Sequence, residues 1–191
     1  MKPFYAAMTE LFEAMEDCRA KQRWLACLVL FYSTLDVLSS LEPDPSGKVK
    51  TGFTNWVGRY VLKSGRFQCA AIDLYGARCG ILHQLTAESD LSRRGEAKRV
   101  LYAWDNAKLE DLEETARRMG VSGDVFVHMS ELLEAAHRGV FEYLEEVKRV
   151  PERAATVEQS VARWLVAMDG EKLNSFLKMS DGKPAWPGDS I

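Results

Sequence analysis

The stretch that decides the fold is residues 24–41, which read WLACLVLFYSTLDVLSSL. Apolar side chains point in nearly every direction around a helix of this sequence, which is typical of a helix that is covered on most sides. The pattern ends at residues 42–47, EPDPSG, where two prolines oppose a helix and the glycine favours a turn. We therefore predict a central helix over about residues 21–41, with other helices packed around it.

Apolar residues also recur at intervals of three and four on both sides of this helix, as in amphipathic helices. The pattern predicts helices at about residues 4–20, 53–63, 67–87 and 108–119, one from Ser130 as N-cap, and one from Pro151 that carries Trp164, Leu165 and Met168. Residues 97–104 and 124–128 read instead as short strands. The expected fold class is mainly α, an antiparallel helical bundle with a small two-stranded insertion and C-terminal helices.

We expect a single domain over residues 1–179. Residues 180–191 hold two prolines and two glycines, and we expect them to form an irregular tail.

Charge and apolar content exclude several classes of protein. The 191 residues include 25 Lys or Arg and 28 Asp or Glu, a formal net charge of −3, which excludes a uniformly basic surface for nucleic acid. The longest apolar run, Trp24–Tyr32, is shorter than the roughly 20 residues of a membrane span. Acidic residues near the N-terminus are unlike a signal or transit peptide, so we expect a cytoplasmic protein without membrane association.

Cysteine and histidine spacing gives no sign of a metal site. The four cysteines include no C-x-x-C pair, and His128 and His137 have no partner at ligand spacing. We expect no disulfide, no metal and no cofactor.

The most informative predicted helix contains residues 73–84, DLYGARCGILHQ. One face is an apolar stripe that we expect to point to the core. Glycine inside a helix costs roughly 0.5–1 kcal/mol relative to alanine, so two glycines four residues apart suggest that another backbone comes close. We predict that this small, apolar face forms a dimer interface, with the residues Ile72, Gly76, Cys79 and Gly80. The alternative is that a neighbouring helix of the same chain covers it.

Two polar residues of this helix, Arg78 and His83, are five positions apart. A regular helix separates such positions by about 140° and about 7.5 Å of rise. We therefore expect them to share a site only if the helix is distorted near Gly80, or if two copies of the helix pack across a two-fold axis.

Residues 78–83, RCGILH, resemble the HEPN (higher eukaryotes and prokaryotes nucleotide-binding) superfamily, whose hallmark is an R-x4-6-H motif on a helix of an all-α bundle. Tyr75 before the arginine, Gln84 after the histidine and the aromatic segment Phe53–Trp56 upstream extend the resemblance, which covers about residues 4–86. It implies a metal-independent endoribonuclease whose site is composed across a homodimer.

In that reading, the resemblance implies that His83 acts as general acid or base and that Arg78 holds the scissile phosphate. RNA supplies its own 2'-hydroxyl nucleophile, so an imidazole and a guanidinium suit the reaction. The resemblance also implies RNA as a partner, a role in phage defence or a toxin system, and an antitoxin or defence-system partner protein.

Three alternatives stay open. Many relatives keep the bundle but act as non-catalytic binding modules for nucleic acid, nucleotide or protein, and the position after the arginine, often polar in active members, is Cys79 here. Cys79 and His83 are four apart, so the thiolate could instead be a nucleophile activated by the imidazole. Asp36 in the central helix either supports the site or faces solvent.

Basic residues concentrate around the motif. Residues 48–104 hold ten Lys or Arg and four Asp or Glu, a net +6, whereas the rest of the chain is −9. Five of these basic residues are our candidates for binding the RNA backbone: Arg59, Lys63, Arg66, Arg93 and Arg94. The alternative is that they are solubilising surface charges.

Overall fold

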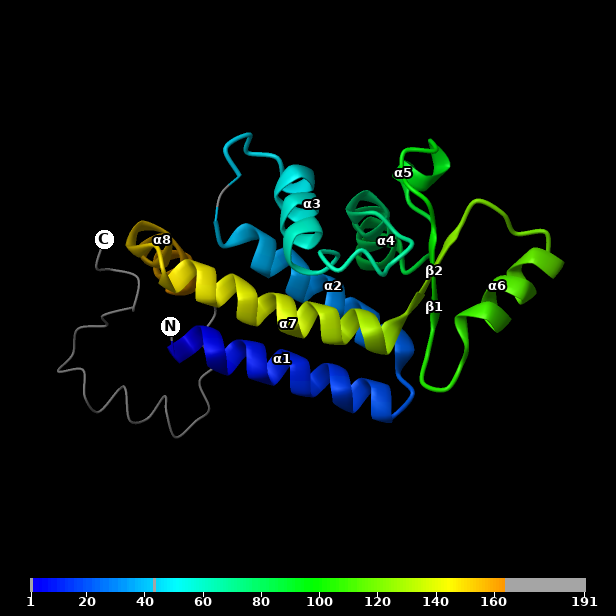
Figure 1. Ribbon diagram of the computed structural model, residues 1–191, viewed down its shortest axis with the longest axis horizontal. Helices are drawn as coiled ribbons and strands as arrows, with labels where there is room; N and C mark the ends of the chain where they lie inside the picture. The colour runs from blue at the N-terminus through cyan, green and yellow to red at the C-terminus, as the bar shows by residue number, and fades with distance from the viewer. Residues whose placement is uncertain (1, 43, 164–191) are drawn as a thin grey trace, which may run out of the picture.

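A computed structural model describes residues 2–42 and 44–163. Helices form a bundle, and a small two-stranded sheet lies at one end of it (Figure 1). The elements are α1 (Lys2–Ala20), α2 (Trp24–Ser40), α3 (Val49–Tyr60), α4 (Ala71–Gln84), α5 (Asp90–Arg93), β1 (Val100–Ala103), α6 (Leu109–Arg118), β2 (Val125–His128), α7 (Met129–Lys148) and α8 (Pro151–Val161). The predictions of a mainly α fold and of a two-stranded insertion are confirmed.

Some sequence predictions lie outside the described residues. These are the part of the last helix that carries Trp164, Leu165 and Met168, the domain boundary at residue 179 and the irregular tail 180–191. Within the described part of the chain, none of the helices is at once long enough and apolar enough to cross a membrane.

Helix α2 is the central helix, as predicted. Phe31, Tyr32, Leu35 and Leu38 are buried, and α2 packs against α1, α3 and α4. Its apolar surface on several sides is what allows three helices to pack on it at once.

Helix α7 covers the other side of α3. A Cβ atom on Gly139 would lie only 2.6 Å from the Tyr60 carbonyl oxygen, so the two backbones approach more closely than a larger residue would allow. The helix begins at Met129 with His128 as its N-cap residue, so the prediction of Ser130 as N-cap is wrong. The reason is that β2 continues into α7 without an intervening loop.

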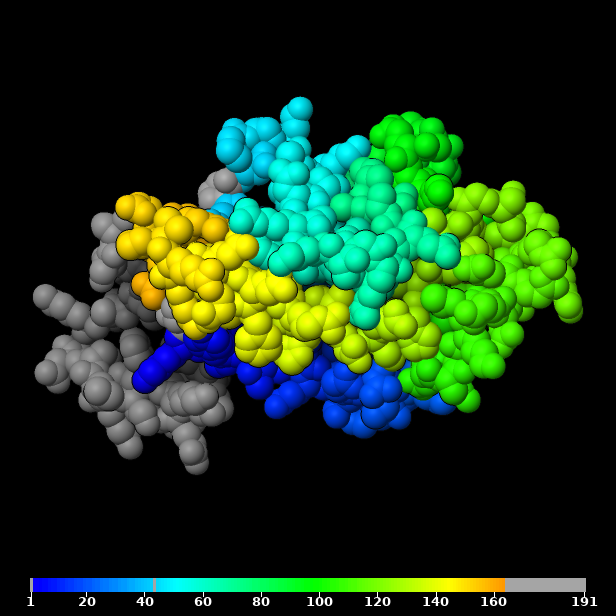
Figure 2. Space-filling model, in the orientation of Figure 1, coloured from blue at the N-terminus to red at the C-terminus, as the bar shows by residue number. Residues whose placement is uncertain are grey.

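The insertion is a β1–α6–β2 unit. The two strands are parallel, with Val100 opposite Val125 and Ala103 opposite His128. The Arg99 Nε and Nη2 atoms each donate to the Asp124 carboxylate at 2.9 Å, and the Tyr102 hydroxyl hydrogen-bonds the Tyr32 hydroxyl of α2. Figure 2 shows the insertion at one end of the molecule. The bond between Tyr102 and Tyr32 attaches it to α2.

Helix α4 is fixed at both ends. At its start the buried Asp73 carboxylate accepts hydrogen bonds from the Ala70 and Lys98 backbone amides, at 2.8 and 2.7 Å. At its end Leu85 adopts a left-handed conformation (φ 54°), and the Thr86 amide donates to the Gly80 carbonyl at 3.2 Å. The helix therefore ends earlier than the predicted residue 87.

The chain that follows α4 folds back over the small face of that helix. A Cβ atom on Gly80 would lie 2.5 Å from the Glu88 carbonyl oxygen and 2.6 Å from that of Thr86, and one on Gly76 would lie 3.0 Å from the Ala97 Cβ. The prediction that Gly76 and Gly80 face a second subunit is therefore wrong, because their own chain covers them. Ile72 and Cys79 are half-buried, and their place in a dimer interface stays a prediction.

Candidate functional site

The Arg78 side chain of α4 is held by a carboxylate of α2. Its Nε donates to Asp36 Oδ1 at 3.1 Å, and its Nη2 donates to Asp36 Oδ2. The Arg78 side chain is 14% exposed and that of Asp36 is 25% exposed. Two parallel charge-assisted bonds fix the plane of the guanidinium as well as its position.

The same guanidinium reaches the histidine of the motif. The distance from Arg78 Nη1 to His83 Nε2 is 3.1 Å. Because a guanidinium has no acceptor, Arg78 is the donor in this contact, and His83 Nε2 can accept the bond in the tautomer that carries its proton on Nδ1. The exposed His83 ring thus lies with Nε2 beside a fixed positive charge.

Arg78 and His83 meet within a single copy of the chain. We expected Arg78 and His83 to converge only through a distorted helix or across a two-fold axis, and that expectation is wrong. Helix α4 is continuous from Ala71 to Gln84, and the long arginine side chain spans the separation within one chain.

Local electrostatics favours the charged guanidinium. Burial opposes the charge of Arg78, but the hydrogen bond and the attraction from Asp36 outweigh it, so the pKa of Arg78 is raised. The Arg78 Cζ atom also lies 5.9 Å from the centre of the Tyr75 ring. Burial and the neighbouring Cys79 raise the pKa of Tyr75, so the phenol stays protonated at neutral pH.

Cys79 belongs to the same cluster but contacts the arginine. Its sulfur lies 3.9 Å from Arg78 Nη1. Among the described residues no hydrogen bond joins this sulfur to His83. The arrangement does not support a thiolate activated by the imidazole.

A hollow of about 580 Å³ opens beside Arg78, between α2, α4 and the segment that leads into α3. Val37, Val49 and Leu82 form apolar parts of its wall. Its charged lining residues are Asp36, Glu42, Asp44, Lys48 and Arg78. A phosphate in this hollow would meet two cations and three carboxylates, so its affinity would depend on how the carboxylates are already paired.

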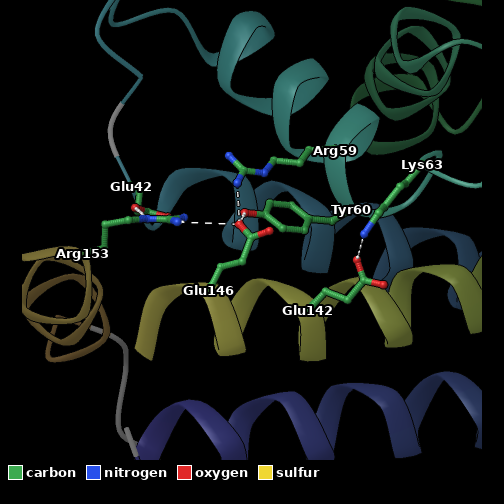
Figure 3. A network of polar contacts seen from close by, with 7 residues as sticks. All are labelled: Glu42, Arg59, Tyr60, Lys63, Glu142, Glu146 and Arg153. Carbon is green, nitrogen blue, oxygen red and sulfur yellow. Dashed lines mark hydrogen bonds and ion pairs between the residues drawn. The ribbon is translucent and has the colours of Figure 1, made fainter. Parts of the chain in front are cut away.

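The five basic residues predicted to bind RNA do not gather at this site. Arg59 pairs with Glu146 at 2.6 Å and Lys63 with Glu142 at 2.9 Å, on the side of α3 that faces α7 (Figure 3). The other three also have partners within the chain: Arg66 with the Glu131 carbonyl, Arg93 with Asp90 and Glu88, and Arg94 with Glu96. Their role in RNA binding stays a prediction.

The pairs of Arg59 and Lys63 border a larger polar network that joins α3, α7 and α8 (Figure 3). Glu146 also accepts a hydrogen bond from the Tyr60 hydroxyl at 2.7 Å and lies 3.7 Å from Arg153 Nη1. Arg153 binds the Glu42 carboxylate with two bonds of 2.7 Å. This network holds helices together and explains these charges without a ligand.

The other two histidines have structural partners. The His128 Nε2 lies 3.0 Å from the Asp105 carbonyl, and the His137 ring packs between Phe12 and Phe141 at centroid distances of 4.7 and 5.1 Å. In residues 2–42 and 44–163, no three His, Cys, Asp or Glu side chains are grouped so that they could bind a metal ion.

The sequence alone leaves the role of Asp36 open. The available signal was a single charged residue in an otherwise apolar helix, which needs a partner if it is not in solvent. That partner proved to be Arg78, 42 positions away.

Comparison of the chain with protein-family models, with curated proteins and with solved structures finds no match.

Proposed function

We propose that the protein is a metal-independent endoribonuclease of HEPN type that cleaves RNA at Arg78 and His83. The observation that carries the proposal is the 3.1 Å contact between Arg78 Nη1 and His83 Nε2, on a guanidinium that Asp36 holds in place. A phosphate-binding fork and a proton acceptor adjacent to each other are the two groups that RNA transesterification requires.

The proposed reaction begins when an imidazole Nε2 takes the proton from the RNA 2'-hydroxyl. The 2'-oxygen then attacks the adjacent phosphorus, and the bond from phosphorus to the 5'-oxygen breaks. The leaving 5'-oxygen takes a proton from a second imidazole that begins in its protonated form and ends neutral, and the products are a 2',3'-cyclic phosphate and a 5'-hydroxyl. We propose that the second imidazole is the His83 of another copy in a homodimer.

Arg78 stabilises the charge that develops on the phosphate oxygens. The Arg78 Nη1 that contacts His83 is free of Asp36, which uses Nε and Nη2. A phosphate can thus replace the imidazole at Nη1 while the carboxylate keeps the guanidinium in place. Asp36 is a positioning residue in this proposal.

The test is incubation of the purified protein with end-labelled RNA in EDTA. We compare wild type with Arg78→Ala and His83→Ala, and use Cys79→Ser as the matched control on the same helix. Loss of cleavage by about 10²-fold or more in the first two, with little change in the third, supports the proposal. Cleavage that survives both alanine substitutions contradicts it.

A mixing experiment tests the homodimer. Wild type is unfolded and refolded together with increasing fractions of His83→Ala at constant total protein. If both copies supply an imidazole, activity falls with the square of the wild-type fraction. A linear fall means that each chain acts alone.

A non-catalytic binding module is the second candidate. It is favoured by the acidic lining of the hollow and by the internal partners of the predicted RNA-binding residues. Absence of cleavage by wild type would support it, and filter binding of labelled RNA would then separate a nucleic-acid-binding module, which retains the RNA, from a module for nucleotide or protein, which does not. The cellular setting that we propose, phage defence or toxin action in the cytoplasm with an antitoxin or defence-system partner, follows from the resemblance alone.

A further inference from the structure

A second hollow lies on the far side of α7 from α3. Helices α1 and α7 run side by side in opposite directions (Figure 1), and a groove of about 1070 Å³ is lined by both of them. The Lys148 Nζ atom lies 5.8 Å from the centre of the Tyr5 ring, so the end of α7 is adjacent to the start of α1. The floor of the groove is apolar: Phe4, Met8, Leu133, Val140 and Leu144.

The groove also has an exposed apolar edge. The Phe141 side chain is 57% exposed, although it borders this apolar floor and contacts the His137 ring. Among the described residues, Tyr5 and Phe141 are the exposed large aromatic side chains, and both line this groove, which indicates a surface that something covers.

The rim of the groove is acidic. Its charged lining residues are Glu10, Glu13, Glu16, Asp17, Glu134 and one cation, Arg19. Arg19 is already paired with Glu16 at 2.9 Å and with Asp105 at 3.1 Å. The groove therefore suits an occupant with an apolar face flanked by lysine or arginine.

We propose that residues 164–179 of this same chain, WLVAMDGEKLNSFLKM, occupy the groove. The segment contains Leu173, Phe176 and Leu177, at the spacing that places three apolar side chains on one face of a helix. Trp164, Leu165 and Met168 precede them. Lys172 and Lys178 supply cations for the acidic rim, and the segment also carries two acids, Asp169 and Glu171, both on the N-terminal side of Leu173.

Position and length agree with this occupant. Helix α8 lies at the same end of the bundle as the start of α1 and the end of α7 (Figure 1), and residues 164–179 follow it within a few positions. Sixteen helical residues span about 24 Å, and the part of α1 from Phe4 to Asp17 spans about 20 Å. A segment of this length that follows α8 is therefore long enough to fill the groove from that end.

Hydrogen exchange of the full chain, followed by mass spectrometry, tests this proposal. We expect the amides of residues 164–179 to be protected in wild type. Phe141→Glu, which alters an exposed side chain and leaves the floor intact, should raise their exchange rate by about tenfold or more. The matched control is Met119→Glu, because Met119 is 74% exposed and does not line the groove.

A second variant tests the proposed contact by changing a residue of the segment 164–179 in place of one in the groove. Phe176→Glu should raise exchange of residues 164–179 in the same way, without any change at the floor of the groove that could unfold the bundle. Unprotected amides in wild type, or protection that Phe141→Glu leaves unchanged, would overturn the proposal.

Protection that increases with protein concentration would also overturn it, because the occupant would then come from a second copy. This proposal goes beyond the proposed function. Because its readout is hydrogen exchange and not RNA cleavage, either proposal can fail without the other.

Discussion

Residues 48–104, whose net charge is +6, contribute basic side chains to two different sets of ion pairs. One is the Asp36–Arg78 pair and the other is the network around Glu146 (Figure 3), and the two differ in how far they are buried. Arg78 is 14% exposed and is held by one carboxylate through two bonds. In the Lys63–Glu142 pair, which lies at the edge of the network, the side chains are 65% and 46% exposed.

The difference in solvent exposure changes how much each ion pair contributes to stability. Water and salt screen exposed ion pairs, which contribute about 0–1 kcal/mol each, whereas a charge removed from water must have a partner. The network is also redundant, since Glu146 has Arg59, Tyr60 and Arg153 around it. In this sequence, the single charged residue in an apolar helix, Asp36, is therefore a better indicator of a site than the local excess of basic residues.

The largest change in stability should follow removal of Asp36. Asp36→Ala leaves the mostly buried Arg78 guanidinium without its anion, and we expect it to lower the free energy of unfolding by about 2–4 kcal/mol. The matched control Glu142→Ala should cost less than about 1 kcal/mol. Urea unfolding followed by circular dichroism measures both, and equal costs would remove the distinction between the two regions.

Gly80→Ala should have the next largest effect. The new methyl group would meet two carbonyl oxygens at 2.5 and 2.6 Å, so we expect a loss of about 1–3 kcal/mol in unfolding free energy. Gly58→Ala in α3 is the control, because its nearest neighbour would be the Ala71 Cβ at 4.0 Å; there, alanine should be neutral or stabilising. A stable Gly80→Ala protein would mean that residues 86–88 are not packed on α4.

Acid should lower the stability that the Glu42–Arg153 pair contributes, and this effect should be smaller than those of the two substitutions above. Burial alone would raise the pKa of Glu42, but the hydrogen bonds from Arg153 outweigh it, so this pKa is lower in the folded protein than in the unfolded chain. The stabilisation is complete above the unfolded pKa and is lost as the pH falls through the folded one. Thermal melts at pH 7 and at about pH 3.5 should show a smaller acid-induced loss for Glu42→Gln than for wild type. Glu13→Gln is the control, and identical acid responses of all three proteins would contradict the assignment.

The smallest effect should come from Lys63→Gln. Because Lys63 already pairs with Glu142 in solvent, its loss should change stability by less than about 0.5 kcal/mol. If Lys63 contacts RNA as the sequence predicted, the same variant will instead bind RNA more weakly and reduce the salt dependence of binding. Filter binding at several salt concentrations distinguishes the two outcomes.

Much of the fold could be read from local patterns. The period of the apolar residues placed the helices within a few positions, and the run at residues 24–41 identified α2 as the central helix. Pro151 marked the start of α8, because proline suits the first turn of a helix.

What could not be read depends on packing between distant segments. The end of α4 is set by Leu85 in a left-handed conformation, which a leucine adopts only when the surroundings impose it. The cover over Gly76 and Gly80 follows from that reversal, and nothing local to the glycines distinguishes it from a second subunit. The Asp36–Arg78 pair likewise required knowledge of how α2 packs on α4.

The β1–α6–β2 unit has a consequence for how the chain could be divided. Both strands are anchored independently, β1 through the bond of Tyr102 to Tyr32 and β2 through its direct continuation into α7. A cut in the loop between β1 and α6 would thus leave two fragments that each carry one strand and one part of the core. The two strands pair in parallel, from Val100 with Val125 to Ala103 with His128. Reassembly of the two fragments would depend on this pairing, so the unit could serve as the junction of a split protein.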